Sequence, residues 1–317
     1  MKMNEKPYVN YIPDMDSQSK AAKEFIQYYT TLRTSLEEPD CTLEEGRRLF
    51  EKWGDLGAEP REVDYIEFDA DGVTCMWVLP KQRSDDRILI CCHGGGYTYG
   101  SMYSHRKAYA HMAKKIGCRG LLVNYRNTPE NKWPAPLEDV VTVYKWLLKS
   151  GYKPEHIAIT GDSCGGALSV STTLTILEEG LPMLAAVMPI CPWFDLMGTT
   201  PRYETNDKDA LNPRSSIQAY GNVLKNAGTD IEDPHLAPMY LKTMKGFPPV
   251  YIQVGGDENM VDEAVIVADT AHDSGVDIRV DIVGHMQHGF HQLAGNCKDA
   301  DAAIERYAEW VRPLLGL

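Results

Sequence analysis

The chain has 317 residues and a net charge of −13, with 43% hydrophobic and 24% charged residues, a composition typical of a globular protein that can bury a large core. The acidic balance argues against nucleic-acid binding and against docking on an anionic membrane surface. No apolar run approaches the length of a membrane span, and residues 1–23 lack the apolar region of a secretory signal. We therefore expect a protein that binds neither nucleic acid nor membranes.

Eight cysteines are spread along the chain without a Cys-x-x-Cys pair or a metal-ligand spacing. Several lie in apolar, strand-like segments, as at Cys91, Cys92 and Cys191. We interpret them as free, buried thiols. Because the cytoplasm keeps thiols reduced, we also expect a cytoplasmic protein.

Strand and helix patterns alternate along most of the chain. Two helical patterns come first, at 19–36 and 42–53, and two strand patterns, 62–69 and 73–80, follow around an Asp-Gly hairpin signal. The later apolar runs cover 88–92, 121–125, 156–160, 184–191, 250–254 and 278–283, and the helices between them lie near 105–116, 135–149, 165–179, 260–273 and 300–314. This alternation predicts an α/β fold with an eight-stranded, mostly parallel sheet flanked by helices.

One region interrupts the alternation, at residues 197–230. It is polar, contains two prolines and carries a helix pattern at 214–226. A long insertion between strands often carries function, as a lid over a site.

Ser163 lies in Gly161-Asp162-Ser163-Cys164-Gly165, a Gly-x-Ser-x-Gly pattern between a strand and a helix. A serine in so tight a turn is held in a strained conformation that presents its hydroxyl at the edge of the sheet, and its neighbours must be small. The pattern favours a serine nucleophile. A phosphate-binding turn is one alternative, and Cys164 as the nucleophile is another, although the register of the turn places residue 163 at its apex.

The glycine-rich loop 93–97 directly follows the strand at 88–92. Ligand-binding groups gather at the carboxyl ends of strands in an open α/β sheet. With the N–H of Cys164, those of Gly95 and Gly96 would form an oxyanion hole. A flexible loop is the alternative.

Two carboxylates, Asp257 and Glu258, follow the strand at 250–254. A carboxylate here would orient a histidine and stabilise the imidazolium. Capping of the next helix by Asp257, with Glu258 in its first turn, is the alternative, and both roles can coexist.

Three histidines, His285, His288 and His291, follow the strand at 278–283. Their spacing has no paired carboxylate motif, which argues against a metal site. A single histidine acting as general base is favoured, and the order serine, acid, histidine matches a known hydrolase arrangement.

Together these motifs resemble the hormone-sensitive-lipase-like branch of the α/β-hydrolase carboxylesterases, from about Val78 to the C-terminus. The matching segments are 93–97 (the HGGG signature), 124–130 (Tyr-Arg-x-x-Pro-Glu), 133–139, 161–166 (GDSAGG), 192–196, 233–234 and 246–249. Cys164 departs from the alanine of GDSAGG.

The resemblance implies site residues and a domain organisation. His288 heads the family's His-Gly-Phe and would be the base. Counting back four residues from Asp262 places Glu258 at the catalytic acid position, so we favour Glu258 over Asp257. The implied α/β-hydrolase catalytic domain covers 56–196 and 231–317, and the implied helical cap covers 1–55 and 197–230.

We therefore expect hydrolysis of short- to medium-chain acyl esters through an acyl-enzyme, without cofactor or metal. A compact apolar acyl pocket is expected, with ordinary packing in the cap as the alternative for each residue: Phe25, Tyr28, Tyr29, Tyr97, Trp193 and Phe194. A lactonase or a deacetylase of acetylated sugars on the same triad stays open, as does a non-catalytic small-molecule binding protein. The resemblance also implies a homodimer, which the sequence neither supports nor opposes.

Overall fold

The computed structural model describes residues 3–317, so the first two residues of the expected cap lie outside the described residues. The strands are β1 (Val9–Ile12), β2 (Val63–Ala70), β3 (Val73–Pro80), β4 (Ile88–Cys92), β5 (Arg119–Val123), β6 (Ile157–Asp162), β7 (Ala186–Ile190), β8 (Val250–Gly255) and β9 (Ile278–Val283). They form one sheet in the order β1-β9-β8-β7-β6-β4-β5-β3-β2. Neighbouring strands run parallel except in the pairs β3–β5 and β2–β3.

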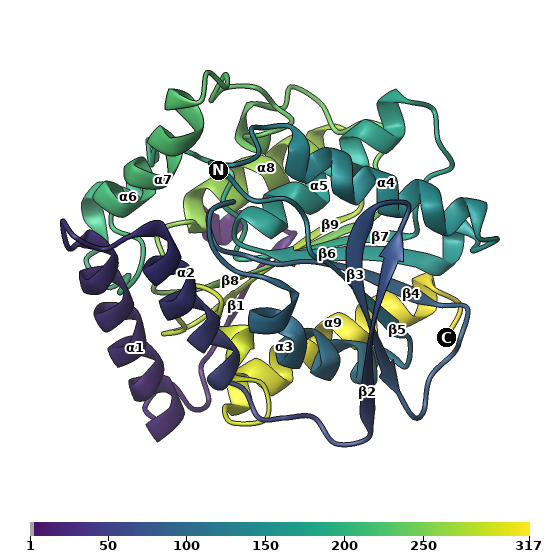
Figure 1. Cartoon of the computed structure of the whole chain (residues 1–317), viewed down its shortest axis with the longest axis horizontal. Coiled ribbons are helices and arrows are strands. Elements are labelled where there is room, and N and C mark those ends of the chain that lie inside the picture. The colour runs from purple at the N-terminus through teal and green to yellow at the C-terminus, as the bar shows by residue number, and fades with distance from the viewer. Residues whose placement is uncertain (1–2) are drawn as a thin grey trace.

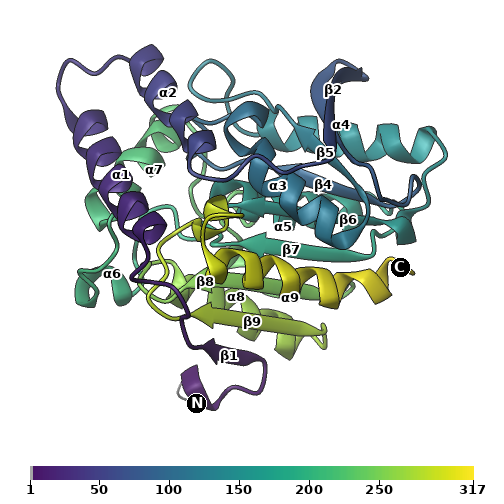
Figure 2. The same ribbon diagram turned by 90° about the horizontal axis from the view of Figure 1, so that it is seen from below.

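The sheet has nine strands rather than the eight expected, because β1 joins its edge. This strand pairs parallel with β9, with Val9 opposite Val280, and Figure 2 shows it beyond β9. It is only four residues long, too short for an alternating pattern to stand out. Residues 9–12, within the segment expected to form the cap, therefore lie in the sheet.

The local sequence explains the other strands. Asp71 and Gly72 both have positive φ, 52° and 94°, as a two-residue type I′ hairpin turn between β2 and β3 requires. In β4, Ile88 and Ile90 face one hydrophobic core and Leu89 faces the other. A strand buried on both faces reads as a continuous apolar run, which is the signal the sequence carries.

Helices cover both faces of the sheet, as Figure 1 shows. The covering helices are α3 (Met102–Ile116) and α9 (Lys298–Leu314) on one face, and α4 (Ala135–Lys149), α5 (Cys164–Glu178) and α8 (Val261–Asp273) on the other. Short 3₁₀ turns lie at η1 (Met3–Glu5), η3 (Pro154–His156), η4 (Pro238–Tyr240) and η5 (Phe290–Leu293).

A second group of helices gathers at one side of the molecule in both ribbon views. Its members are α1 (Lys20–Glu37), α2 (Leu43–Glu51), η2 (Lys52–Asp55), α6 (Arg202–Thr205) and α7 (Arg214–Asn226). The first three come from the N-terminal segment and the last two from the 197–230 insertion. Ser216 Oγ lies 3.3 Å from Glu37 Oε1, which joins α7 to α1. Among the described residues, none of the helices combines the length and apolar character that a membrane crossing requires.

Candidate active site

Ser163 occupies a strained turn between β6 and α5. Its backbone has φ 56° and ψ −123°, a conformation that costs a residue with a side chain about 1–3 kcal/mol. The turn is held by hydrogen bonds from Ser163 N–H to Ile190 O and from Trp193 N–H to Ser163 O, both 3.0 Å. A Cβ added to Gly161 would lie 2.1 Å from Gly165 O. The small neighbours are therefore a steric requirement of the turn.

The loop after β4 brings two glycines to the serine. Gly95, Gly96 and Tyr97 have φ values of 116°, 61° and 59°, and a Cβ at Gly95 would lie 2.2 Å from Tyr99 O. Gly95 and Gly96 border the same cavity as Ser163. Cys164 begins α5, where N–H groups have no partner within the helix. The three expected oxyanion-hole residues thus lie around Ser163.

The structure pairs His288 with Glu258 rather than with Asp257. His288 Nδ1 lies 2.5 Å from Glu258 Oε2, and Gly255 N–H donates to the other oxygen, Oε1, over 2.7 Å. Both side chains are buried. Because the carboxylate accepts, we assign the proton to Nδ1, which leaves Nε2 as the basic nitrogen. Asp257 lies 3.7 Å from His285 Nδ1 instead, with 18% of its side chain exposed.

Charges around His288 favour its protonated form. Burial alone would lower the pKa of His288, but the hydrogen bond and charge of Glu258, with the charges of Asp209 and Asp162, raise it above its ordinary value. Asp162 is itself buried, and the nearby His105 and Tyr109 hold the pKa of its carboxyl below the usual value despite that burial. A general base works best when its pKa lies near the working pH.

The three histidines after β9 do not converge on one point. His291 Nε2 lies 2.8 Å from Gln253 Oε1, and burial lowers the pKa of His291 to about 3. Among residues 3–317, one group of histidine, cysteine and acidic side chains is spaced closely enough to hold a metal ion: Cys191, Glu258 and His288. Its histidine and glutamate already face each other in the 2.5 Å contact.

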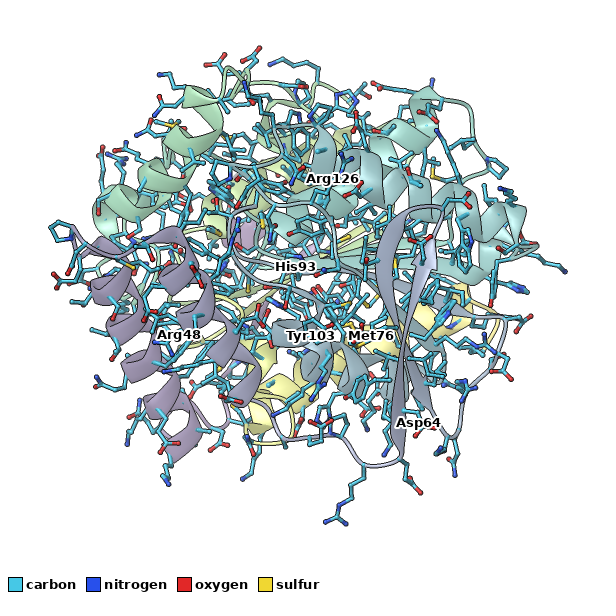
Figure 3. The ribbon with its side chains drawn as sticks, in the orientation of Figure 1. Arg48, Asp64, Met76, His93, Tyr103 and Arg126 are labelled. Atoms are coloured by element: carbon cyan, nitrogen blue, oxygen red, sulfur yellow. The ribbon has the colours of Figure 1, made fainter. Side chains whose placement is uncertain are left out.

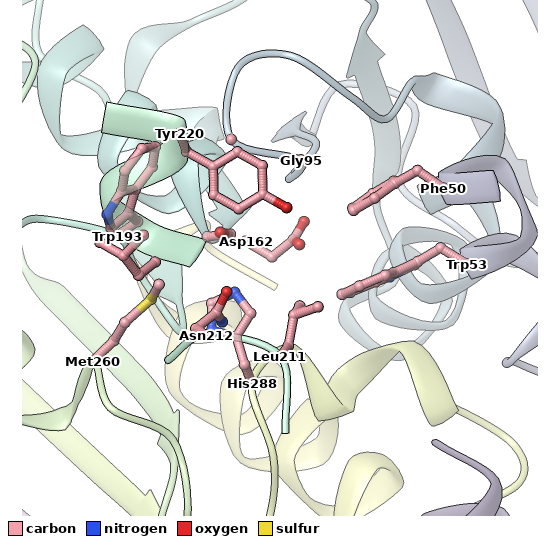
Figure 4. Close-up of a pocket in the computed structure, with 13 residues that line it drawn as sticks. Phe50, Trp53, Gly95, Asp162, Trp193, Leu211, Asn212, Tyr220, Met260 and His288 are labelled. Atoms are coloured by element: carbon pink, nitrogen blue, oxygen red, sulfur yellow. The ribbon is translucent and has the colours of Figure 1, made fainter. Parts of the chain in front are cut away.

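A small cavity opens beside Ser163 and His288. It encloses about 370 Å³ of empty space, including its open mouth. In Figure 4, the parallel rings of Phe50 and Trp53 lie across the cavity from Trp193 and Met260. The lining residues are Phe50, Trp53, Gly95, Gly96, Asp162, Ser163, Trp193, Leu211, Asn212, Ile217, Tyr220, Met260 and His288.

The aromatic residues of α1 do not line this cavity, which corrects the expected pocket. Phe25 and Tyr29 are fully buried, with ring centres 6.2 Å and 5.1 Å from that of Trp53. Tyr28 Oη donates to a carbonyl of α2. The Tyr29 hydroxyl donates to the carbonyl of His288. These side chains support the wall and the histidine loop from behind, because they form the inward face of an amphipathic helix.

Two further expected pocket residues, Tyr97 and Phe194, are also buried away from the cavity surface, whereas Trp193 lines it as expected. Phe194 N–H donates to Glu263 Oε2 over 2.5 Å. Tyr97 packs its ring 6.3 Å from that of Trp193. The Tyr97 ring therefore packs near the lining residue Trp193, and neither it nor the Phe194 ring lines the cavity.

Sequence reasoning missed most of the wall. The missed lining residues are Phe50, Trp53, Asp162, Leu211, Asn212, Ile217, Tyr220 and Met260. Several lie in segments that were expected to form the cap. The available signal was the helical pattern at 42–53 and 214–226, which identifies the helices but not the faces that meet the site.

The insertion also holds the loop that carries Glu258. Arg202 Nε donates to Glu258 O over 2.7 Å, and a second Arg202 nitrogen donates to Gly256 O. Asn206 Nδ2 donates to Asp257 O over 2.9 Å. The backbone carbonyls of three consecutive residues, 256–258, thus accept from side chains near the start of the insertion, and we refer to the loop that carries Glu258 as the acid loop.

Asp209 extends this connection. Its buried carboxylate accepts from Asn259 N–H and from Asn212 N–H, each over 2.8 Å. The side chain of Gln287, next to the histidine, accepts from Ala210 N–H over 2.9 Å. Segment 202–212 therefore fastens both the acid loop and the histidine loop.

A mostly parallel sheet, a strained serine after one strand, and a paired carboxylate and histidine after later strands define a serine hydrolase of the α/β type. Residues 89–292 match the family described as alpha/beta hydrolase fold. The chain is 31% identical over 274 residues to an acetyl-hydrolase of Streptomyces hygroscopicus, covering 85% of this chain and 88% of that protein. It is 24% identical over 282 residues to an ethyl acetate hydrolase of Pseudomonas putida, covering 84% and 88%.

Among solved structures, an esterase from the bacterial hormone-sensitive lipase family superposes with a TM-score of 0.89 at 31% identity, over 95% of this chain and all of that one. The chain belongs to the α/β-hydrolase family, in its hormone-sensitive-lipase-like branch, and is a serine carboxylesterase.

Proposed function

We propose that the protein hydrolyses short- to medium-chain acyl esters through an acyl-enzyme on Ser163, with His288 as the base and Glu258 as the acid. The observation that carries the proposal is the buried 2.5 Å contact between His288 Nδ1 and Glu258 Oε2, beside a cavity that both Ser163 and His288 line. With Nδ1 donating to the carboxylate, Nε2 takes the proton of the serine hydroxyl as the oxygen attacks the ester carbonyl.

The negative charge that develops on the carbonyl oxygen is stabilised by the N–H groups of Gly95, Gly96 and Cys164. Losing one such donor costs about 10²–10³ in turnover. His288 then returns its proton to the departing alcohol, and the same residue activates the water that releases the acid. These steps need no cofactor.

The walls of the cavity support a short acyl group. Aromatic rings form two of its sides beside Ser163. The names of two relatives, an acetyl-hydrolase and an ethyl acetate hydrolase, point in the same direction. The first of these names also favours a second candidate within the same chemistry, the deacetylation of an acetylated small molecule.

The helices around the cavity are proposed to act as a cap. In this division the catalytic domain covers 56–196 and 231–317, and the cap covers 1–55 and 197–230 apart from the strand at 9–12. Support comes from Phe50 and Tyr220, which reach the cavity from the two cap segments. A homodimer and a cytoplasmic location stay predictions, which the mass in solution and cell fractionation test.

Covalent labelling tests the assignment of Ser163. An organophosphate should modify the wild-type protein at Ser163 and should leave Ser163→Ala unmodified, because the proposed nucleophile is gone. Ser171→Ala, a buried serine further along α5, is the matched control and should be labelled normally. Labelling that persists in Ser163→Ala would contradict the proposal.

A chain-length series tests the substrate class. Turnover of p-nitrophenyl esters should be fastest for acetate to butyrate and slow for palmitate, because the aromatic walls limit the acyl group. Acetylated sugars and lactones belong in the same series. Faster cleavage of palmitate than of butyrate would overturn the expected chain length.

A further inference from the structure

Cys164 is where the chain departs from the alanine of the GDSAGG signature, and its side chain is not a reactive thiol. It is fully buried, and burial raises the pKa of the Cys164 thiol to about 12. Since the thiolate is the reactive form of cysteine, the sulfur next to Ser163 is a neutral group. Its function must lie in what it touches.

The sulfur touches the loop of the oxyanion hole. Tyr97 N–H donates to Cys164 Sγ over 3.2 Å, and the thiol lies 3.9 Å from His93 O. The hydroxyl of Tyr125 lies 3.6 Å from the sulfur and donates to the same His93 carbonyl over 2.6 Å. Figure 3 places His93 near the middle of the molecule. The sulfur therefore contacts both ends of the 93–97 loop, at His93 and at Tyr97. It also contacts Tyr125, whose hydroxyl binds the loop at His93.

The loop needs such a partner at Tyr97. Gly95, Gly96 and Tyr97 form an uninterrupted run of positive φ. Hydrogen bonds to carbonyl oxygens of the loop help to hold it, from Tyr99 N–H to Gly95 O over 2.8 Å and from Thr128 N–H to Tyr97 O over 2.7 Å. A buried amide without a partner costs about 1–3 kcal/mol. The sulfur is the partner that the structure gives to Tyr97 N–H.

We propose that Cys164 is a positioning residue of the oxyanion hole, whose sulfur fixes the Tyr97 amide and thereby the N–H groups of Gly95 and Gly96. The inference rests on the proposed function, in which these amides bind the oxyanion. The backbone N–H of Cys164 is the third donor of that hole. One residue therefore supplies a donor on the serine side and sets the position of the donors on the other side.

Alanine and serine at this position separate positioning from packing. Cys164→Ala removes the acceptor of Tyr97 N–H, and kcat for p-nitrophenyl butyrate should fall about tenfold, below the 10²–10³ of a lost donor, while KM changes less than about twofold. A hydroxyl can accept the same N–H, so Cys164→Ser should recover most of the loss. The affinity of a boronic acid inhibitor, which places an oxygen in the hole, should fall by the same factor as kcat.

Cys118→Ala is the matched control. Cys118 is also a fully buried thiol, but it precedes β5 and so lies at the opposite end of the strands from the site. The Cys118→Ala variant should lose about as much thermal stability as Cys164→Ala and should keep the wild-type kcat.

Unchanged kcat and inhibitor affinity in Cys164→Ala, or a loss that Cys164→Ser does not recover, would overturn the proposal. Organophosphate labelling separates this from failure of the proposed function. If wild type and Cys164→Ala are both labelled at Ser163, the nucleophile stands whatever the role of the sulfur. If the wild type is not labelled, the proposed function itself fails.

Discussion

The loops at the carboxyl ends of the strands and the helical segments that wall the cavity position their residues in different ways. In the loops the backbone leaves no freedom: a Cβ at Gly161 would lie 2.1 Å from a carbonyl oxygen, and Ser163 is held at φ 56°. In the walls, side chains such as Phe50, Trp53 and Tyr220 reach the cavity from the sides of helices. The loops at the strand ends therefore position the catalytic groups, and the packing of the helices determines the shape of the cavity that accepts the substrate.

The difference predicts separable effects. Changes in the loops should lower turnover for every ester, whereas changes in the walls should alter which ester is preferred. Segment 202–212 crosses this division, because it contributes Leu211 and Asn212 to the wall and also holds the acid loop through Arg202 and Asp209.

The largest effect is expected in the acid loop. Glu258→Gln should lower kcat by about 10³–10⁴, because the imidazolium loses its charged partner and the histidine loses its preferred tautomer. Asp257→Asn, the matched neighbour, should stay within a few-fold of the wild type, since Asp257 faces His285. Steady-state kinetics with p-nitrophenyl butyrate measures both. A larger loss in Asp257→Asn would assign the acid to that residue instead.

The segment that crosses the division should show an intermediate effect with a pH signature. Asp209→Asn should lower kcat about tenfold, which corresponds to about 1.4 kcal/mol, the scale of one hydrogen bond. The Asp209 charge raises the pKa of His288, and the base acts when neutral, so activity rises as pH rises through that pKa. Without the charge of Asp209, the pKa of His288 should fall.

The acid limb of the kcat/KM profile should therefore move to lower pH in Asp209→Asn. Asp207→Asn, an exposed neighbour, is the control and should keep the wild-type profile. An unmoved limb in Asp209→Asn would show that Asp209 acts on structure alone.

A wall residue should change preference rather than turnover. Leu211 and Tyr220 line both the catalytic cavity and a neighbouring cavity that α1 and α7 also line. Leu211→Ala should connect the two and raise the octanoate-to-butyrate ratio of kcat/KM about fivefold, within the range of a few methylene contacts. Leu36→Ala, which widens only the second cavity, should leave the ratio unchanged. Equal ratios in the two variants would contradict the role given to Leu211.

The smallest effect on activity is expected far from the site, in the β2–β3 hairpin. Gly72 has φ 94° with open space around it, so Gly72→Ala should cost about 1–2 kcal/mol through backbone strain alone. Urea unfolding should show the loss and kinetics should show none. A fall in kcat would mean that the edge of the sheet is coupled to the loops.

The sequence predicted the loops better than the walls. Ser163, His288 and the Gly95–Gly96 pair stand in short motifs whose geometry follows from the strands before them, and eight strands lie near their expected positions. The residues alone left Asp257 and Glu258 as alternatives, and only the family resemblance favoured Glu258, because the sequence does not show which of two adjacent side chains in a turn faces the histidine. Hydrogen bonds from Arg202 and Asn206, far away in sequence, help to set that turn.

The walls were missed for a related reason. The helical patterns identified α1, α2 and α7, but not the rotation and docking of each helix. Phe25 and Tyr29, which were expected to line the cavity, instead pack against Trp53. Phe50 and Tyr220, which were not expected there, line it. Only the packing of two distant segments against each other decides such placements. The short strand β1 escaped prediction because four residues carry too little pattern.

The central claim is that the strained turn makes Ser163 the nucleophile while the adjacent sulfur stays neutral. Wild-type protein mixed with p-nitrophenyl butyrate, quenched in acid within milliseconds, digested and sequenced by mass spectrometry tests it directly. The account predicts a butyryl group on Ser163 that survives neutral hydroxylamine, as an ester does. A hydroxylamine-sensitive butyryl group on Cys164, or turnover without any acylated residue, would contradict it.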